Sequence, residues 1–105
     1  MSSMRNVLIA YTKRNPLIGY CQGMNFILGR LVQNLNEEEA FWVYSMLMEQ
    51  VLPIDYYAQM IGVHADVEYF GEDLLKSVLP EVHEHFIDLN FKATFFSFNW
   101  FVCLF

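Results

Sequence analysis

The stretch Ile18–Phe26 constrains this chain most, because two glycines lie immediately before an apolar helical pattern. Gly19 and Gly23 bracket Tyr20 and Gln22, and glycine permits backbone angles and close approaches that a side chain forbids. A glutamine amide donates and accepts hydrogen bonds without carrying charge, so it can hold a water molecule or face a phosphate. The sequence therefore predicts a polar site at the entrance of a helix.

The first half of the chain shows helical spacing of apolar residues. Residues 4–13 are predicted as a helix that Pro16 ends, because the residue before a proline is pushed out of the helical region. A second helix is expected from Gly19 or Tyr20 to about Asn34, with Gln22 in its first turn. Its core stripe comprises Tyr20, Met24, Ile27, Leu28, Leu31 and Leu35. Gln22 lies off this stripe.

The remaining segments are also predicted to be helical. Asn36 and Glu39 form a capping-box pattern that starts a helix running to Pro53. Residues 54–65 are expected to be a loop with a short helix, with Gly62 as a breaker, followed by helices over 66–78 and 80–89, the latter capped by Asn90. The aromatic segment 94–105 fits a helix or a strand by periodicity, and the helical context favours a helix. The fold class is all-α, a helical array of about five or six helices.

Composition and charge exclude several kinds of partner. Of the 105 residues, 55% are hydrophobic, so a body this small carries more apolar surface than it can hide alone. We therefore expect a partner to cover it, or the chain to be part of a larger core. A net charge of −6 argues against nucleic acid and an anionic membrane surface. No signal peptide is visible, and the most apolar run is shorter than the roughly 20 residues that span a bilayer.

A set of motifs in this order resembles the TBC domain of Rab GTPase-activating proteins. The motifs are Ala10-Tyr11, Arg14-Asn15-Pro16, Gly19-Tyr20-Cys21-Gln22-Gly23-Met24-Asn25-Phe26, Glu38-Glu39-Ala40-Phe41-Trp42, Leu52-Pro53, Tyr56-Tyr57, Leu79-Pro80 and Trp100-Phe101-x-x-Leu104-Phe105. The resemblance covers nearly the whole chain. It implies that residues 1–105 are a partial TBC domain, truncated at both ends, because a complete domain of this family is longer.

The resemblance also implies a function, GTPase activation toward a Rab-type small GTPase in its GTP-bound form. Gln22 would be the catalytic glutamine finger that orients the water attacking the γ-phosphate, supported by Tyr20 and Gly23. Three further residues would contact the partner: Arg14, Asn15 and Asn25. The GTPase would supply nucleotide and magnesium, so no cofactor is expected in this chain. The implied setting is vesicle trafficking in the cytoplasm, peripheral to endomembranes through the GTPase.

The residues by themselves leave alternatives open. Spacing alone favours a solvated or capping role for Gln22, and Tyr20 could equally be a core aromatic and Gly23 a small residue at a helix crossing. The family's arginine finger comes from an Ile-x-x-Asp-x-x-Arg motif, which this sequence lacks. The chain could therefore be an inactive, TBC-like module that docks a GTPase or a scaffold partner. An unrelated helical bundle with an aromatic oligomer interface is a third reading.

Other chemistry finds little support in the sequence. His83 and His85 are two residues apart, so on a helix they point to different faces and do not form a metal pair. Cys21 has no residue clearly placed as its base, which favours a small buried cysteine over a nucleophile. No metal site is expected.

Overall fold

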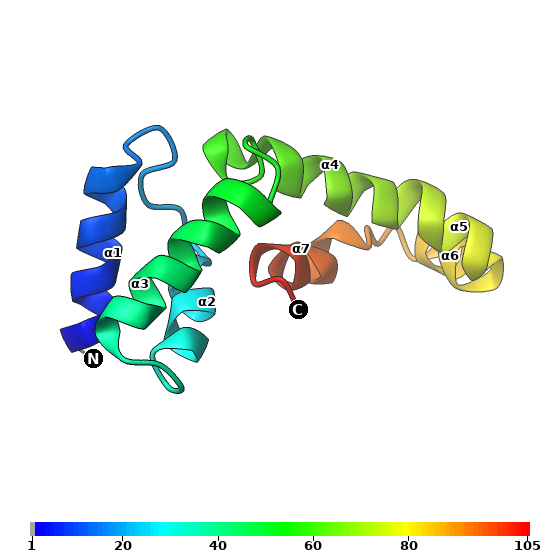
Figure 1. Ribbon diagram of the computed structural model, residues 1–105. Helices are drawn as coiled ribbons and strands as arrows, with labels where there is room; N and C mark the ends of the chain where they lie inside the picture. Colours follow the sequence, from blue (N-terminus) through cyan, green and yellow to red (C-terminus); the bar gives the residue numbers. More distant parts are fainter. Residues whose placement is uncertain (1) are drawn as a thin grey trace. The chain divides into compact units, whose positions relative to one another are not determined.

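The computed structural model describes residues 2–105, and in this range every regular element is helical (Figure 1). Adjoining elements are continuous at four junctions, so the ten elements of the described residues form six continuous helical segments, which confirms the predicted all-α class. The chain divides into two compact units, Met1–Gly62 and Val63–Phe105, which we describe separately.

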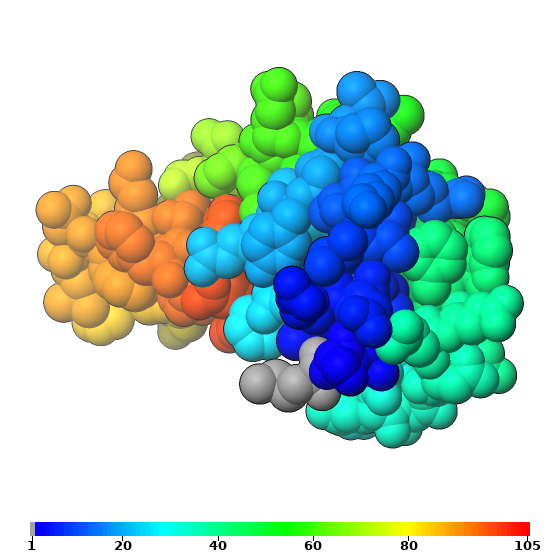
Figure 2. All heavy atoms as spheres, turned by 90° about the vertical axis from the view of Figure 1, so that its left-hand side faces the viewer, coloured from blue at the N-terminus to red at the C-terminus, as the bar shows by residue number. Residues whose placement is uncertain are grey.

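The first unit is built from three α-helices: α1 (Ser2–Arg14), α2 (Met24–Leu31) and α3 (Glu37–Met46). A π-helical turn, Leu47–Val51, continues α3, and a 3-10 turn follows at Ala58–Met60. Helix α1 packs against α2 and α3, and the space-filling view shows α1 at the surface beside α3 (Figures 1 and 2). The core between them comprises Val7, Tyr11, Met24, Leu28, Ala40, Tyr44 and Met48.

Two features of the sequence set the ends of these helices. The backbone N–H of Glu39 donates to Asn36 Oδ1 at 3.0 Å, and the N–H of Asn36 donates to Glu39 Oε2 at 3.1 Å. This reciprocal pair is the predicted capping box, and it starts α3 at Glu37. Helix α1 ends at Arg14, as expected, because Pro16 pushes the residue before it out of the helical region.

The second unit contains most of α4 (Ile61–Tyr69), a π-helical turn (Phe70–Leu74), α5 (Leu75–Val78), α6 (Pro80–Asp88) and α7 (Thr94–Val102). Asn90 has a φ of 51° after α6, and the N–H of Phe91 donates to the carbonyl of Phe86 at 2.8 Å. This left-handed C-cap was predicted from the sequence. The aromatic segment is helical, as predicted, although α7 ends at Val102.

Two expectations for this part of the chain were wrong. Helix α4 begins at Ile61 rather than at 66, and Gly62 lies inside its first turn instead of breaking it. In α6, Val82 and Ile87 are 39% and 63% exposed. Helix α6 packs against α5, and the ring centroid of its Phe86 lies 5.3 Å from that of Phe91. Within residues 2–105, no helix is long and apolar enough to cross a bilayer.

Candidate functional site

The loop between α1 and α2 carries most of the predicted site residues. It starts at Asn15, whose N–H still donates to the carbonyl of Tyr11 at 2.8 Å and so completes the last turn of α1. Gly19 then takes a φ of 60° and donates its N–H to the carbonyl of Asn15 at 3.0 Å. A side chain would be strained at that φ, so the glycine is what lets the chain turn back after Pro16.

Gly23 decides where α2 begins. Its φ of 104° is left-handed, so an α-helix cannot continue through it, and the helix starts at Met24. The predicted start at Gly19 or Tyr20 was therefore too early. Gln22 lies in the turn that precedes the helix rather than in its first turn, and it is exposed. The amide of Gln22 is thus held on a turn whose next residue is locked in the left-handed region.

Tyr20 is not a core residue, contrary to the expected stripe, since it is 56% exposed. The helical period that suggested burial does not apply, because Tyr20 precedes the helix. Its hydroxyl lies 3.5 Å from Asn25 Oδ1, a long contact at the limit of a hydrogen bond. Tyr20 and Gln22 are exposed just before α2, and half-buried Asn25 is the second residue of that helix.

Cys21 anchors the far end of this loop. Its thiol donates to the carbonyl oxygen of Tyr57 at 3.1 Å, and its backbone N–H lies 3.1 Å from the sulfur of Met24. Burial raises the pKa of the Cys21 thiol, which favours its protonated form. The thiol therefore has a structural contact, although Cys21 is half-buried rather than buried as expected.

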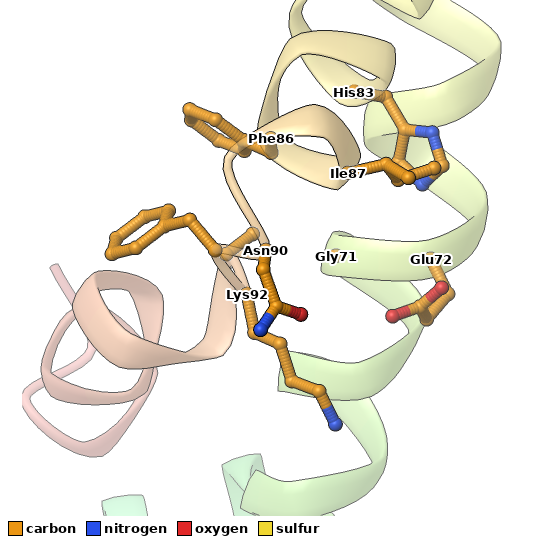
Figure 3. A pocket seen from close by; sticks show the side chains of 9 residues that line it. Gly71, Glu72, His83, Phe86, Ile87, Asn90 and Lys92 are labelled. Atoms are coloured by element: carbon orange, nitrogen blue, oxygen red, sulfur yellow. The ribbon is translucent and has the colours of Figure 1, made fainter.

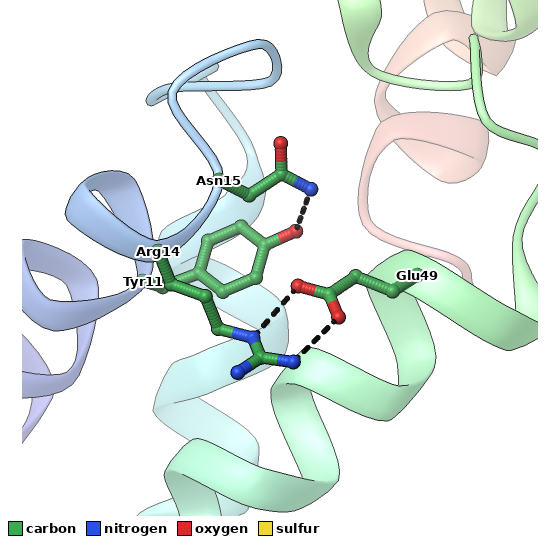
Figure 4. Close-up of polar contacts among 4 residues, drawn as sticks. All are labelled: Tyr11, Arg14, Asn15 and Glu49. Atoms are coloured by element: carbon green, nitrogen blue, oxygen red, sulfur yellow. Dashed lines mark hydrogen bonds and ion pairs between the residues drawn. The ribbon is translucent and has the colours of Figure 1, made fainter.

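Arg14 anchors the near end of the loop (Figure 4). Its Nε and Nη2 atoms donate to the two carboxylate oxygens of Glu49, each at 3.0 Å, and its guanidinium carbon lies 5.5 Å from the ring centroid of Trp42. The hydrogen bonds and the charge of Glu49 raise the pKa of Arg14 further. This parallel pairing is the geometry in which arginine binds a carboxylate most specifically. The guanidinium is therefore engaged within the first unit.

A buried tyrosine pair lies beneath the same loop. The ring centroids of Tyr11 and Tyr44 are 5.0 Å apart in an edge-to-face arrangement. Burial, and secondarily the charge of Glu49, raises the pKa of Tyr11 to about 12, although a hydrogen bond from Asn15 Nδ2 to its hydroxyl at 3.4 Å opposes this (Figure 4). Burial also raises the pKa of Tyr44, whose buried hydroxyl has no hydrogen-bond partner among residues 2–105.

Sequence reasoning missed three participants in this arrangement: Glu49, Trp42 and Tyr57. Glu49 and Tyr57 lie far along the chain from the residues they contact, by 35 and 36 positions. Trp42 and Tyr57 belong to motifs noted in the sequence, whereas Glu49 belongs to none. The spacing of these residues did not predict their contacts with Arg14 and Cys21. The arrangement presents an exposed amide at Gln22 and an arginine cation that is paired with Glu49.

The second unit, Val63–Phe105, contains a cavity with a volume of about 180 Å³ (Figure 3). Phe86, Ile87 and Phe91 line it, while Glu72, His83 and Lys92 provide its ionisable groups. None of the predicted site residues lies there. His83 lines the cavity and His85 does not, which agrees with their prediction on different faces. The part of the chain that is described holds no group of three metal-ligating side chains.

Comparison with known proteins gives a consistent result. The model of the Rab-GTPase-TBC domain family matches residues 1–105. TBC1 domain family member 2B of Homo sapiens is 39% identical over 106 aligned residues, which cover 100% of this chain and 11% of that protein. Growth hormone-regulated TBC protein 1 of Homo sapiens is 42% identical, and the alignment covers 98% of this chain and 31% of that protein. The Xenopus tropicalis protein of the same name is 43% identical, and the alignment covers 95% of this chain and 29% of that protein. The chain thus spans about a tenth to a third of the length of these relatives, and it belongs to the Rab-GTPase-TBC domain family.

Proposed function

We propose that this chain carries the catalytic glutamine of a GTPase-activating protein that acts on a Rab-type small GTPase. The observation that carries the proposal is Gln22, which is exposed in a turn bounded by left-handed Gly19 and Gly23. Membership of the Rab-GTPase-TBC family makes a Rab GTPase the natural partner. The partner would be in its GTP-bound form and would bring the nucleotide and its magnesium ion.

The chemistry fits a neutral amide. Phosphoryl transfer depends almost entirely on positioning and on charge stabilisation, so a residue that orients the attacking water is effective without acting as a strong base. The amide of Gln22 can accept a hydrogen bond from a water and donate one to a phosphate oxygen. Tyr20 and Asn25 would contact the partner beside it, and buried Gly23 would support the turn that presents Gln22.

An arginine finger would have to come from elsewhere in the protein. Arg14 is paired with Glu49, and the sequence lacks the family's Ile-x-x-Asp-x-x-Arg motif. We therefore propose that residues 1–105 are one part of a longer TBC domain whose remainder supplies the arginine. The protein would work in the cytoplasm, reaching endomembranes through its GTPase partner.

The alternative is a docking module without catalytic activity, and the missing arginine motif is the observation in its favour. Single-turnover GTP hydrolysis, measured across a panel of Rab GTPases, separates the two. The full-length protein should accelerate hydrolysis, while the 105-residue chain should do so weakly, since an arginine finger is worth about 10³–10⁵ in turnover.

Gln22→Ala in the full-length protein completes this test. It should lower the rate by about 10²–10³, as the loss of one preorganised donor does, with little change in affinity for the GTPase. Gln33→Ala, at an exposed position of the same unit, is the matched control and should retain the rate. A Gln22→Ala protein with its full rate would leave the docking module as the better account.

A further inference from the structure

Both ends of the loop that carries Gln22 are held by one segment of the chain. At the near end, Arg14 forms its two hydrogen bonds with Glu49, and at the far end the thiol of Cys21 donates to the carbonyl of Tyr57. Glu49 lies in the π-helical turn Leu47–Val51, and Tyr57 follows Leu52 and Pro53. The segment 49–57 therefore contacts the loop on either side of Gln22.

From this geometry we propose that Arg14 is a positioning residue: paired with Glu49, it holds the Gln22 loop in its productive conformation and does not itself contact nucleotide or GTPase. The inference rests on the proposed function for its effect on hydrolysis. The structural coupling between the Arg14–Glu49 pair and the loop can be measured without any GTPase.

The contacts of Arg14 support this assignment over that of a solvated surface arginine with no fixed orientation. Two parallel hydrogen bonds of 3.0 Å fix the orientation of the guanidinium as well as its position. The ring of Trp42, 5.5 Å away, adds a cation–π contact. The side chains of Arg14 and Glu49 are 43% and 24% exposed, so solvent screens the pair only in part.

The position of Arg14 explains why the pair would act on the loop. Arg14 is the last residue of α1 and precedes Asn15, the first residue of the loop. Asn15 in turn accepts the N–H of Gly19 and donates its own side-chain amide to Tyr11. Loss of the guanidinium would free the end of α1 to fray, and the loop would lose one of its two anchors.

A charge-exchange experiment in the full-length protein distinguishes positioning from direct catalysis. Arg14→Ala and Glu49→Gln should each lower the turnover number by about 10- to 100-fold, with a smaller change in KM for the GTPase. The double variant Arg14→Glu with Glu49→Arg should recover most of the rate, because it restores the pair with reversed charges. Arg14→Lys keeps the positive charge but cannot form two parallel hydrogen bonds, so its rate should lie between those of Arg14→Ala and the unaltered protein. Arg30→Ala is the matched control, since the Arg30 guanidinium is exposed and donates to Gln33 Oε1 at 3.3 Å, on the same helix end and away from Glu49.

The second readout is the reactivity of the Cys21 thiol, measured in the full-length protein as iodoacetamide alkylation of the peptide that carries Cys21. In Arg14→Ala and Glu49→Gln, Cys21 should be alkylated several-fold faster, because a loop with one anchor lost opens more often. The exchanged pair should restore protection. This readout does not depend on activity. If the unaltered protein accelerates no GTPase, the proposed function fails while the alkylation result still decides the coupling.

Three results would overturn the inference. A faster rate in Glu49→Gln would mean that the carboxylate holds back a catalytic arginine. An exchanged pair that restores Cys21 protection but not turnover would mean that Arg14 touches the GTPase or its nucleotide. Unchanged Cys21 alkylation in every variant, with melting temperature preserved, would mean that the pair does not control the loop.

Discussion

The thiol of Cys21 lies 3.1 Å from the carbonyl oxygen of Tyr57, 36 residues further along the chain. Cys21 is the immediate neighbour of Gln22, so this contact fixes the backbone next to the proposed catalytic amide. A thiol is a weak donor, and its small apolar body also packs here, half-buried. The contact therefore matters more for the position of the loop than for global stability.

Cys21→Ala tests this role. The variant should lose about 1 kcal/mol of folding free energy, as the deletion of one half-buried contact does. Its rate in the GTPase assay should fall by more than the small decrease in the folded fraction can explain. Cys21→Ser retains a donor and should recover part of the rate. Chemical denaturation and single-turnover kinetics on both variants provide the comparison, and equal rates in all three proteins would argue against an anchoring role for Cys21.

Tyr20→Ala addresses a residue whose burial was predicted wrongly. Because the side chain is 56% exposed, its removal should change the free energy of unfolding by no more than about 0.5 kcal/mol. Under the proposed function its ring contacts the GTPase, so affinity should fall while the melting temperature stays nearly constant. Tyr20→Phe removes only the long contact to Asn25 and should bind as well as the unaltered protein. A large drop in melting temperature for Tyr20→Ala would contradict the exposed position.

Local sequence rules predicted the helices well and the loop geometry poorly. The capping box at Asn36 and Glu39, the proline after α1 and the C-cap at Asn90 depend only on nearby residues, and the structure confirms all three. The start of α2 was wrong because helical periodicity carries on through Gly23, whereas the left-handed φ of that glycine does not permit a helix to do so.

The candidate site was predictable in its residues and not in its contacts. Gln22 was singled out by a motif that lies within a few consecutive positions. The pairing of Arg14 with Glu49 and of Cys21 with Tyr57 joins residues more than thirty positions apart, and no local pattern encodes such partners. Position 62 illustrates the same point: a glycine is required there because the backbone of Tyr56 lies too close for a Cβ, and not because the helix breaks.

Gly62→Ala should therefore destabilise the protein. A Cβ at this position would lie 2.7 Å from the Cα of Tyr56, and that backbone atom cannot move aside as the end of a side chain can. Overpacking of this kind costs about 1–3 kcal/mol. Gly29→Ala is the matched control: its Cβ would lie 3.7 Å from the sulfur of Met4, and an alanine inside α2 should gain roughly 0.5–1 kcal/mol. Thermal melts of the two variants should shift in opposite directions, and a neutral Gly62→Ala would contradict the close approach.

The buried tyrosine pair predicts that stability falls in alkaline solution. Burial raises the pKa of Tyr11 to about 12, whereas an unfolded tyrosine titrates near 10. The unfolded chain therefore loses its proton first as the pH rises, so the stabilising contribution is complete below about pH 10 and is lost as the pH rises through about 12. A difference of about two pKa units corresponds to roughly 3 kcal/mol, and burial shifts the pKa of Tyr44 in the same direction.

Denaturant titrations between pH 8 and pH 11.5 measure this loss, and phenylalanine variants assign it. Tyr44→Phe removes a buried hydroxyl that has no partner among residues 2–105, so at pH 8 it should leave stability unchanged or raise it slightly. Tyr11→Phe gives up the contact with Asn15 and should cost about 0.5–1.5 kcal/mol at pH 8. The double variant should show a much flatter decline above pH 10 than the unaltered protein. An equally steep decline in the double variant would assign the alkaline transition to other groups and remove the support for a buried, neutral pair beneath the Gln22 loop.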